Sequence, residues 1–160
     1  SIPRGGACVL DVGCGSGAMF LDLMEAGACE IEGVDLSGRM VQAAQDKFSF
    51  DPRIHVVQED FLAHETPGYD VLMAFNSYHH FLQPRLFLKK ARELLRPHGR
   101  LTVAFPFDRE RMNTLSAILP AGLARGLLPA AEEMAFWREW FEVDCVCDNE
   151  SFYLISGVAR

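Results

Sequence analysis

The stretch Val9–Phe20, VLDVGCGSGAMF, places three glycines and an aspartate in one turn. The apolar run Ala7–Val12 leads into this turn and predicts a strand that is covered on both faces. Residues Ala18–Ala26 have helical character and end at Gly27. Glycine costs backbone entropy wherever it sits, so three glycines in a strand-to-helix turn indicate that a ligand approaches the main chain closely.

The bulk composition bounds the class of protein. A length of 160 residues, with 49% hydrophobic and 23% charged residues, predicts one folded domain over residues 1–160. The net charge of -7 argues against a nucleic-acid partner. No apolar run reaches the roughly 18 residues of a membrane span. The chain begins at a serine without a charged-then-apolar leader, so we expect a cytoplasmic fragment without a signal peptide.

The five cysteines are Cys8, Cys14, Cys29, Cys145 and Cys147. Three of them lie in apolar stretches with strand character, which predicts reduced and buried thiols and no disulfide framework. The Cys-x-Cys pair near the C-terminus has no second Cys/His pair close to it, so we predict no metal site.

Short apolar runs alternate with helical patterns, which predicts an α/β fold with a mostly parallel sheet. The further strands are expected at Ile31–Asp35, Ile54–Gln58, Tyr69–Phe75 and Arg100–Phe105, and the further helices at Gly38–Phe48 after a Ser37 cap, Pro84–Leu95 and Ala130–Trp140. Residues 109–129 predict a short helix and an irregular loop. The tail from Phe141 predicts two strands joined by a turn at Asp148-Asn149, and therefore a terminal antiparallel hairpin.

The glycine turn alone does not decide which ligand binds. GCGSGA satisfies the dinucleotide fingerprint, and Asp35 lies at the right distance beyond it to bind a ribose of any nucleoside. Asp11 places a carboxylate beside the ligand, which suits a cationic group better than a pyrophosphate. Asp60 and Phe61 follow the third strand, where an acid and a backbone N–H suit an adenine edge.

The order of motifs carries a resemblance to a known family. The segments VLDVGCGSG, GVDLS, QEDF, YDVLMAFNSYHHF and LLRPHGRLTVAF follow one another at that family's spacings. The sequence resembles a class I S-adenosylmethionine-dependent methyltransferase over almost its whole length. The resemblance implies a Rossmann-like, doubly wound sheet of seven strands, mostly parallel, with a C-terminal antiparallel hairpin.

The resemblance also implies S-adenosyl-L-methionine as the cofactor. Asp11 would hold its amino end, Asp35 its ribose hydroxyls and Asp60 its adenine amino group. The residues expected to bind the cofactor are Asp11, Gly13, Cys14, Gly15, Gly17, Asp35, Leu36, Asp60, Phe61 and Asn76.

In the family, the residues after the fourth strand face the transferred methyl group. Ser77, Tyr78, His79 and His80 would therefore line the reaction centre. An oxygen or nitrogen acceptor needs to lose a proton, and histidine is a suitable base. His80 is the first candidate, ahead of His79 and Tyr78; the alternative is that the histidines only shape the pocket. His55, His64 and His98 are expected at the surface.

The region 109–129 lies where the family often builds a substrate lid, and its arginines Arg109, Arg111 and Arg125 are either substrate contacts or solvated charges. The family carries cap helices before the first strand, and we expect them to be missing from this chain. The predicted function is methyl transfer to a small-molecule acceptor. The alternatives are a cofactor-binding core without activity, as in a regulatory or partner-dependent subunit, and a nicotinamide-dependent reductase. The acceptor atom, the substrate and the oligomeric state remain open.

Overall fold

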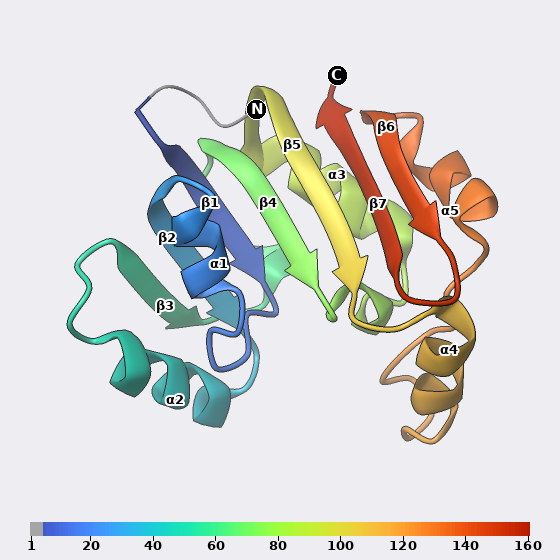
Figure 1. Ribbon diagram of the computed structural model, residues 1–160, viewed down its shortest axis with the longest axis horizontal. Helices are drawn as coiled ribbons and strands as arrows, with labels where there is room; N and C mark the ends of the chain where they lie inside the picture. The colour runs from blue at the N-terminus through green and yellow to red at the C-terminus, as the bar shows by residue number, and fades with distance from the viewer. Residues whose placement is uncertain (1–4) are drawn as a thin grey trace.

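The computed structural model describes residues 5–160 and contains a seven-stranded sheet in the order β3-β2-β1-β4-β5-β7-β6 (Figure 1). The strands are β1 (Ala7–Val12), β2 (Ala28–Asp35), β3 (Ile54–Gln58), β4 (Tyr69–Phe75), β5 (Leu95–Phe105), β6 (Phe141–Asp148) and β7 (Tyr153–Ala159). The pairs from β3 to β5 are parallel, and β7 is antiparallel to both β5 and β6. The predicted fold class is confirmed. The expectation that cap helices are missing before β1 falls on the start of the chain. Residues 1–4 there lie outside the described part of the chain.

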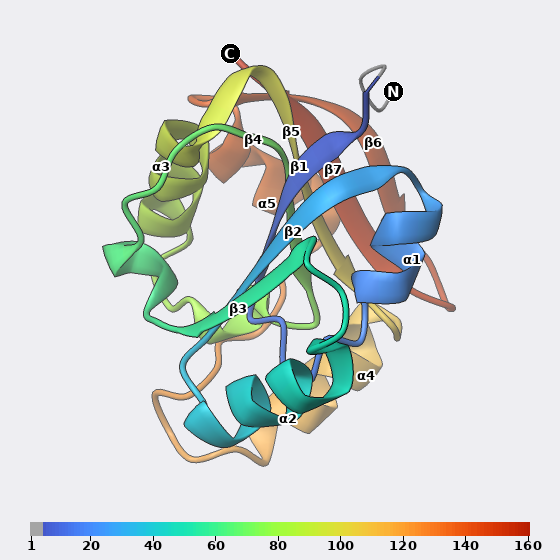
Figure 2. The ribbon, with the colours of Figure 1, turned by 90° about the vertical axis from the view of Figure 1, so that its left-hand side faces the viewer.

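Helices cover both faces of the sheet. They are α1 (Phe20–Glu25), α2 (Gly38–Phe48), α3 (Pro84–Leu94), α4 (Arg109–Ala117) and α5 (Ala130–Trp137), with short 3-10 turns η1 (Phe61–Ala63) and η2 (Tyr78–His80). α1 and α3 lie on opposite sides of the sheet, and β3 forms one edge (Figure 2).

Two apolar clusters hold these layers together. In one, Phe20 of α1 and Phe48 of α2 pack on one face of β1 and β2, with their ring centroids 5.2 Å apart. In the other, Phe87 of α3 and Trp137 of α5, both fully buried, pack on the opposite face of the central strands. β1 contributes side chains to both clusters, which explains why it reads as a continuous apolar run.

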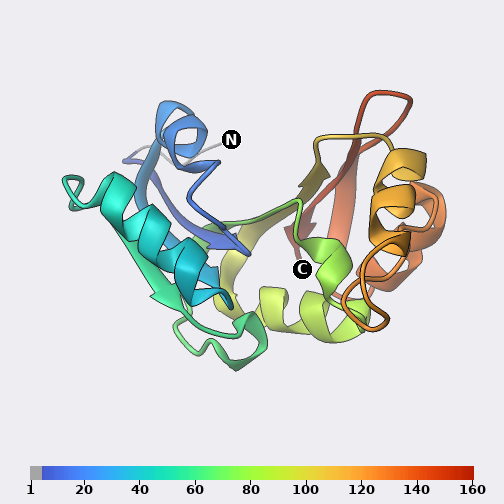
Figure 3. The same ribbon diagram turned by 90° about the horizontal axis from the view of Figure 1, so that it is seen from below.

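The strand order reverses between β1 and β4. From β1 the chain proceeds outward to β2 and β3, and then returns to place β4 on the other side of β1. The turns that leave β1 and β4 therefore diverge and leave a crevice at the carboxyl ends of the strands, which is where ligands bind in open α/β sheets. Figure 3 looks onto the carboxyl ends of the strands. The β1–α1 turn lies on one side, and η2 lies on the other, beside the segment 118–129.

The predicted bounds agree with the structure except at a few ends. β1, β3, β4 and α2 are confirmed to the residue, and the Ser37 hydroxyl accepts from the Met40 N–H at 3.4 Å as the expected cap. The prediction that RPHG separates a helix from a strand is wrong. β5 already begins at Leu95, and RPHG forms a bulge in it, where His98 has a left-handed φ of 62°.

The C-terminal hairpin is confirmed, with a longer turn than expected. β6 ends at Asp148 and β7 begins at Tyr153. The Asn149 side chain closes the turn by accepting from the N–H groups of Ser151 and Phe152 at 2.8 and 3.1 Å. The helix before the hairpin is shorter than predicted, because α5 ends at Trp137.

One part of the sheet is less covered than the rest. In Figure 1, no helix of the described chain lies in front of β5 and β7. Alternate residues of these strands, Thr102 and Ala104 in β5 and Leu154 and Val158 in β7, accordingly remain half-buried. This open face begins beside the crevice at the end of β4.

Gly157 tests the register of the hairpin. A Cβ at this position would lie 2.8 Å from the carbonyl oxygen of Glu142 and 3.1 Å from the Cα of Val143, both backbone atoms that have little room to move. We expect Gly157→Ala to lower the free energy of unfolding by about 1–3 kcal/mol in urea titrations. Val158→Ala, on the open face, is the control and should cost less. A Gly157→Ala variant as stable as the wild type would contradict the pairing of β6 with β7.

Candidate functional site

The turn after β1 is fixed by backbone contacts to β2. The Gly13 N–H donates to the carbonyl oxygen of Val34 at 2.8 Å. The Asp35 carboxylate accepts from the N–H groups of Gly15 and Ser37, each at 2.8 Å. Asp35 thus ties together the loops that follow β1 and β2, and this contact with the chain itself comes in addition to any bond with a ligand.

A cavity of about 300 Å³ lies at the reversal point between β1 and β4. Its lining residues are Asp11, Gly13, Cys14, Gly15, Ser16, Ala18, Met19, Met40, Phe75 and Asn76. Five of the ten residues expected to bind a cofactor are among them. Larger hollows, of about 520 and 440 Å³, lie beside the β6–β7 turn and between α2 and β3. We assign the site to the smaller cavity because the predicted chemistry converges there.

A side chain is excluded at each of the three glycines of the turn for a different physical reason. All have positive φ, but a Cβ on Gly15 would meet no heavy atom within 4 Å, so it would point into open space. A Cβ on Gly13 would lie 2.5 Å from the Cβ of Ser77, and one on Gly17 would lie 2.7 Å from the Phe20 ring. Only Gly15 thus leaves room for a ligand. Gly17 lies outside the cavity lining, and Gly13 and Gly17 leave room for the chain's own packing.

Asp11 presents an unusual carboxylate to the cavity. Its side chain is 1% exposed, and Oδ2 has no hydrogen-bond partner among the described residues. Burial, and then the charge of Asp35, raises the pKa of Asp11 to about 7. A buried carboxyl without a partner costs free energy, and a cationic ligand group at Oδ2 would offset that cost.

The residues expected on the adenine side lie outside this cavity. Leu36 is 70% exposed, and Asp60 is exposed and accepts from the Leu62 N–H at 2.9 Å at the start of η1. The Phe61 side chain is buried against Phe87. Their adenine contacts stay predictions. At the other end, Asn76 lines the cavity with a left-handed φ of 53°, a conformation that asparagine tolerates better than most residues.

Two of the residues after β4 are buried and form hydrogen bonds within the protein. The Ser77 hydroxyl is buried and donates to the carbonyl oxygen of Val12 at 2.6 Å. Tyr78 is fully buried and donates to Glu133 at 2.8 Å. Burial, and then the Glu133 charge, raises the pKa of Tyr78 well above its ordinary value, so the hydroxyl keeps its proton. Tyr78 therefore packs inside the protein and does not line the cavity, and its catalytic role stays a prediction.

The two histidines differ in burial. The His79 side chain is 5% exposed and stacks on Phe105, and Nδ1 has no hydrogen-bond partner among the described residues. Burial, then the charges of His80 and Arg125, lower the pKa of His79 to about 4, which makes it a weak base. His80 is exposed, and its Nδ1 lies 2.7 Å from the carbonyl oxygen of Leu123. Of the two, His80 is the group that a substrate can reach.

The expectation that His64 lies at the surface is wrong. Its side chain is buried, with Nδ1 2.6 Å from Glu59 and Nε2 2.9 Å from the Tyr69 hydroxyl. Tyr69 in turn donates to Glu32 at 2.5 Å. This polar cluster fixes the loop that carries Asp60 onto β2 and β4. No local sequence motif indicates this cluster, because its members come from three separate segments.

The arginines of the predicted lid are engaged within the protein. Arg125 forms an ion pair with Glu133 at 2.6 Å, Arg109 lies 3.6 Å from Asp148, and Arg111 lies over the Phe107 ring. The sequence contained a signal that Glu133 lies on the buried face of its helix. Helical spacing puts it on the same face of α5 as Ala130 and Trp137, both of which are buried.

The cysteines are all free thiols. Cys14 is buried, Cys8 and Cys147 are half-buried, and Cys29 and Cys145 are exposed. Of the three cysteines in the predicted strands, the prediction of a buried thiol is wrong for Cys145. Within residues 5–160, no three His, Cys, Asp or Glu side chains form a group that could hold a metal ion. In the same range, no helix has the length and apolar character that a membrane crossing requires.

Comparison with known proteins defines the family. A family model described as "Methyltransferase domain" matches residues 9–99, which is more than half of the chain. The chain belongs to this methyltransferase family, in the class I S-adenosylmethionine-dependent group that the sequence motifs resemble.

Curated relatives extend well beyond the matched region. A ubiquinone biosynthesis O-methyltransferase of Xylella fastidiosa is 30% identical over 133 residues, which cover 80% of this chain and 53% of the relative. The 27-O-demethylrifamycin SV methyltransferase of Amycolatopsis mediterranei is 32% identical over 105 residues, 62% of this chain and 39% of that protein. The chain therefore spans about half or less of the length of these relatives.

Solved structures share the fold. A methyltransferase from Haloferax volcanii, in complex with its Trm112 activator, superposes with a TM-score of 0.83 at 20% identity, over 97% of this chain and 83% of that one. An S-adenosylmethionine-dependent methyltransferase from Mesorhizobium loti gives a TM-score of 0.76 at 16% identity, over 96% and 91% of the two chains.

The residues at the cavity fit S-adenosylmethionine. The unpartnered oxygen of Asp11 suits the cofactor's ammonium group, and the open space beside Gly15 admits a ligand against the backbone. Asp35 lies outside the cavity lining, at the end of β2, and is bonded to the N–H of the lining residue Gly15. It can accept from ribose hydroxyls through the lone pairs that its two backbone contacts leave free.

Alanine substitutions at the three glycines distinguish the space that is left for a ligand from the space that the chain's own packing requires. Gly15→Ala should destabilise the folded state by only about 1–2 kcal/mol, the cost of a left-handed alanine. It should weaken S-adenosylmethionine binding at least tenfold, because the new methyl group occupies the ligand's space. Gly13→Ala and Gly17→Ala carry the same left-handed backbone cost and should lower the free energy of unfolding by about 1–3 kcal/mol more, as at other overpacked sites. Calorimetry and urea unfolding on the three variants measure both effects. Full binding by Gly15→Ala would contradict the assignment.

Asp11→Asn should stabilise the ligand-free protein while it impairs binding. The pKa of Asp11 is raised from 3.8 to about 7, so the folded state holds this proton more tightly than the unfolded state. The associated stability is present below about pH 4 and is lost as the pH rises through 7. Asparagine stays neutral, so at pH 8 the variant should gain on the order of 2–4 kcal/mol over the wild type.

Urea unfolding at pH 4 and pH 8 measures this difference, which should be near zero at pH 4. Glu25→Gln, an exposed acid on α1, is the control and should show no such dependence. An Asp11→Asn variant less stable than the wild type at pH 8 would overturn the interpretation of Asp11 as a strained carboxyl.

Proposed function

We propose that this chain, as a single domain over residues 1–160, binds S-adenosylmethionine and transfers its methyl group to a small-molecule acceptor. The observation that carries the proposal is the buried, unpartnered carboxylate of Asp11 in a cavity at the β1–β4 reversal point. This carboxylate needs a cation, and the backbone beside Gly15 leaves space for the molecule that carries it. Membership of the methyltransferase family supports the choice of cofactor.

The chain's own residues mostly bind and orient. S-adenosylmethionine supplies an activated methyl group on its sulfonium, so positioning of the acceptor accounts for much of the catalysis. Asp11 receives the ammonium group of the methionine moiety, Asp35 the ribose hydroxyls and Asp60 the adenine amino group. Asn76 closes the cavity on the side of β4, next to the residues that lead to His80.

The acceptor is a small molecule that offers a hydroxyl group. The names of two relatives support this choice, because both describe O-methylation of small molecules or of their precursors. The net charge of -7 also disfavours a nucleic-acid substrate. His80 takes the hydroxyl proton, since it is exposed while His79 and Tyr78 are buried.

A second candidate is a cofactor-binding core that turns over only in combination with another chain. The open face of β5 and β7 beside the crevice favours it, because a second chain that packs on these half-buried strands would complete the crevice. If this candidate is right, the chain binds S-adenosylmethionine with the affinity that the first candidate predicts. The chain alone then transfers no methyl group.

Calorimetric titration with S-adenosylmethionine, with its demethylated product and with NADH tests the proposal. We expect micromolar binding of the first two ligands and none of NADH. Asp35→Asn should weaken binding about tenfold or more, since it removes a charged acceptor of ribose hydroxyls. Asp22→Asn, an exposed acid on α1, is the matched control and should bind like the wild type.

Incubation with labelled cofactor and a panel of phenols and aliphatic alcohols then follows methyl transfer. Transfer to a hydroxyl supports the first candidate, and binding without transfer supports the second. Binding of NADH in place of S-adenosylmethionine would refute both candidates.

A further inference from the structure

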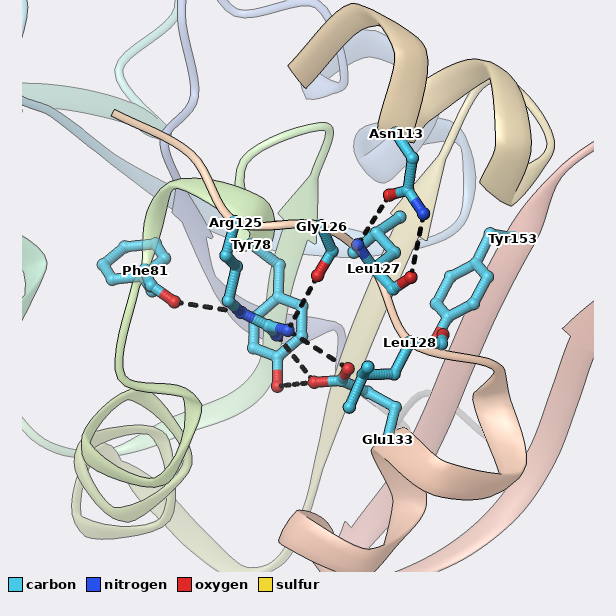
Figure 4. A network of polar contacts seen from close by, with 9 residues as sticks. All are labelled: Tyr78, Phe81, Asn113, Arg125, Gly126, Leu127, Leu128, Glu133 and Tyr153. Carbon is cyan, nitrogen blue, oxygen red and sulfur yellow. Dashed lines mark hydrogen bonds and ion pairs between the residues drawn. The ribbon is translucent and has the colours of Figure 1, made fainter. Parts of the chain in front are cut away.

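The segment 118–129 between α4 and α5 has no regular secondary structure, yet it is held from two sides. On the side of α4, the Asn113 side chain donates to the carbonyl oxygen of Leu127 at 3.0 Å and accepts from its N–H at 2.6 Å (Figure 4). The Tyr153 hydroxyl of β7 donates to the carbonyl oxygen of Leu128 at 3.1 Å. The segment is therefore a fixed part of the crevice rim and not a loose connection.

On the other side, Arg125 fastens the segment to η2. Its backbone N–H donates to the carbonyl oxygen of His79 at 2.9 Å, and its Nε donates to that of Phe81 at 3.2 Å. The guanidinium lies over the Tyr78 ring, 4.7 Å from the centroid, and forms two hydrogen bonds with Glu133, at 2.6 and 3.2 Å (Figure 4).

The Arg125–Glu133 pair is buried and fully used within the protein. Glu133 is 0% exposed and the Arg125 side chain 14%, and Tyr78 adds a third hydrogen bond to the carboxylate. Burying two charges costs several kcal/mol per ion unless the geometry compensates, and a pair of hydrophobic residues would often serve stability as well. Stability is therefore a weak explanation for an ion pair at this position.

Another explanation lies in the neighbouring residues. In the same segment, the carbonyl oxygen of Leu123 lies 2.7 Å from Nδ1 of His80. A carbonyl only accepts hydrogen bonds, so Nδ1 carries the proton. In the neutral imidazole, Nε2 then has the free lone pair. The position of the segment therefore decides which nitrogen of His80 accepts a proton.

We propose that Arg125 and Glu133 are positioning residues that lock segment 118–129 onto η2, so that Leu123 holds the Nδ1 proton of His80 and Nε2 serves as the base. This inference rests on the proposed function. In the step that it serves, the acceptor hydroxyl gives its proton to Nε2, and its oxygen bonds to the methyl carbon. The carbon–sulfur bond breaks and its electron pair stays on sulfur, which becomes a neutral thioether. The imidazolium then returns the proton to solvent.

Nitrogen-15 NMR of histidine-labelled protein at pH 8, without cofactor, tests the proposal. Long-range proton–nitrogen correlations distinguish a protonated ring nitrogen from an unprotonated one. We expect the wild type to show Nδ1 protonated and Nε2 unprotonated for His80, in a ratio about tenfold above that of the exposed His98. Arg125→Ala should bring the His80 ratio to within about threefold of that of His98, because the Leu123 carbonyl is no longer held in place.

Three controls separate positioning from general damage. The ring signals of His64, buried in its own cluster, should stay unchanged in Arg125→Ala and so report an intact fold. Arg111→Ala, an arginine of α4 outside the network, should leave His80 unchanged. Arg125→Lys keeps the charge but offers fewer donors, and should give an intermediate ratio. Should Arg125→Ala fail to fold, Arg125→Lys together with Glu133→Gln carries the test.

Protonated Nε2 with unprotonated Nδ1 in the wild type would overturn the proposal, and so would a His80 ratio that Arg125→Ala and Arg125→Lys leave unchanged. The result does not depend on cofactor binding. Calorimetry with S-adenosylmethionine is run on the same samples, and Arg125→Ala should bind it like the wild type, since Arg125 does not line the cavity. A wild type that does not bind the cofactor refutes the proposed function and not the NMR result.

Discussion

A carboxyl group buried at the end of β1 determines what the cavity can hold. Asp11 belongs to a strand that packs on both of its faces, so its side chain cannot turn out to solvent without disturbing β1. The nearby charge of Asp35 makes ionisation of Asp11 harder still. A ligand that brings a cationic group to Oδ2 relieves both penalties. The site is in this sense destabilised until it is filled, which is common where proteins bind or catalyse.

The topology explains why this carboxyl lies where a ligand arrives. Because the strand order reverses between β1 and β4, the turns at the carboxyl ends of these two strands open away from each other. Asp35 fastens the β1 turn to the β2 loop, and Ser77 fastens the β4 loop to β1 through the carbonyl oxygen of Val12. These ties fix the cradle before a ligand binds. On the far side, the Arg125–Glu133 pair fixes the rim in the same way.

The sequence predicts the parallel part of the fold well, because buried strands such as Ala7–Val12 and Tyr69–Phe75 read as apolar runs between turn signals. The glycine turn is also a local signal. What the sequence does not reveal are polar contacts between distant segments. Tyr78 and Glu133 are 55 residues apart, and a tyrosine beside the crevice suggests catalysis until its partner is seen.

The same limit applies to the misassigned His64 side chain. Tyr69 and Glu32, which enclose His64, are 37 residues apart, and no periodicity in a single segment brings them together. The sequence alone also does not distinguish the roles of the three glycines. Their separate roles depend on whether Ser77, Phe20 or open space lies opposite each Cα, and this is decided by tertiary packing.

The most direct measurement is the number of protons that S-adenosylmethionine displaces when it binds, from calorimetry at pH 6.5 in buffers of different ionisation enthalpy. With a pKa of about 7, most Asp11 carboxyls are protonated at this pH, whereas the cofactor's amino group is already a cation. If the ammonium group pairs with Asp11, binding should release roughly half a proton or more per cofactor, and none in Asp11→Asn. Equal proton release by the wild type and the variant, or no release by either, would contradict the central role of Asp11.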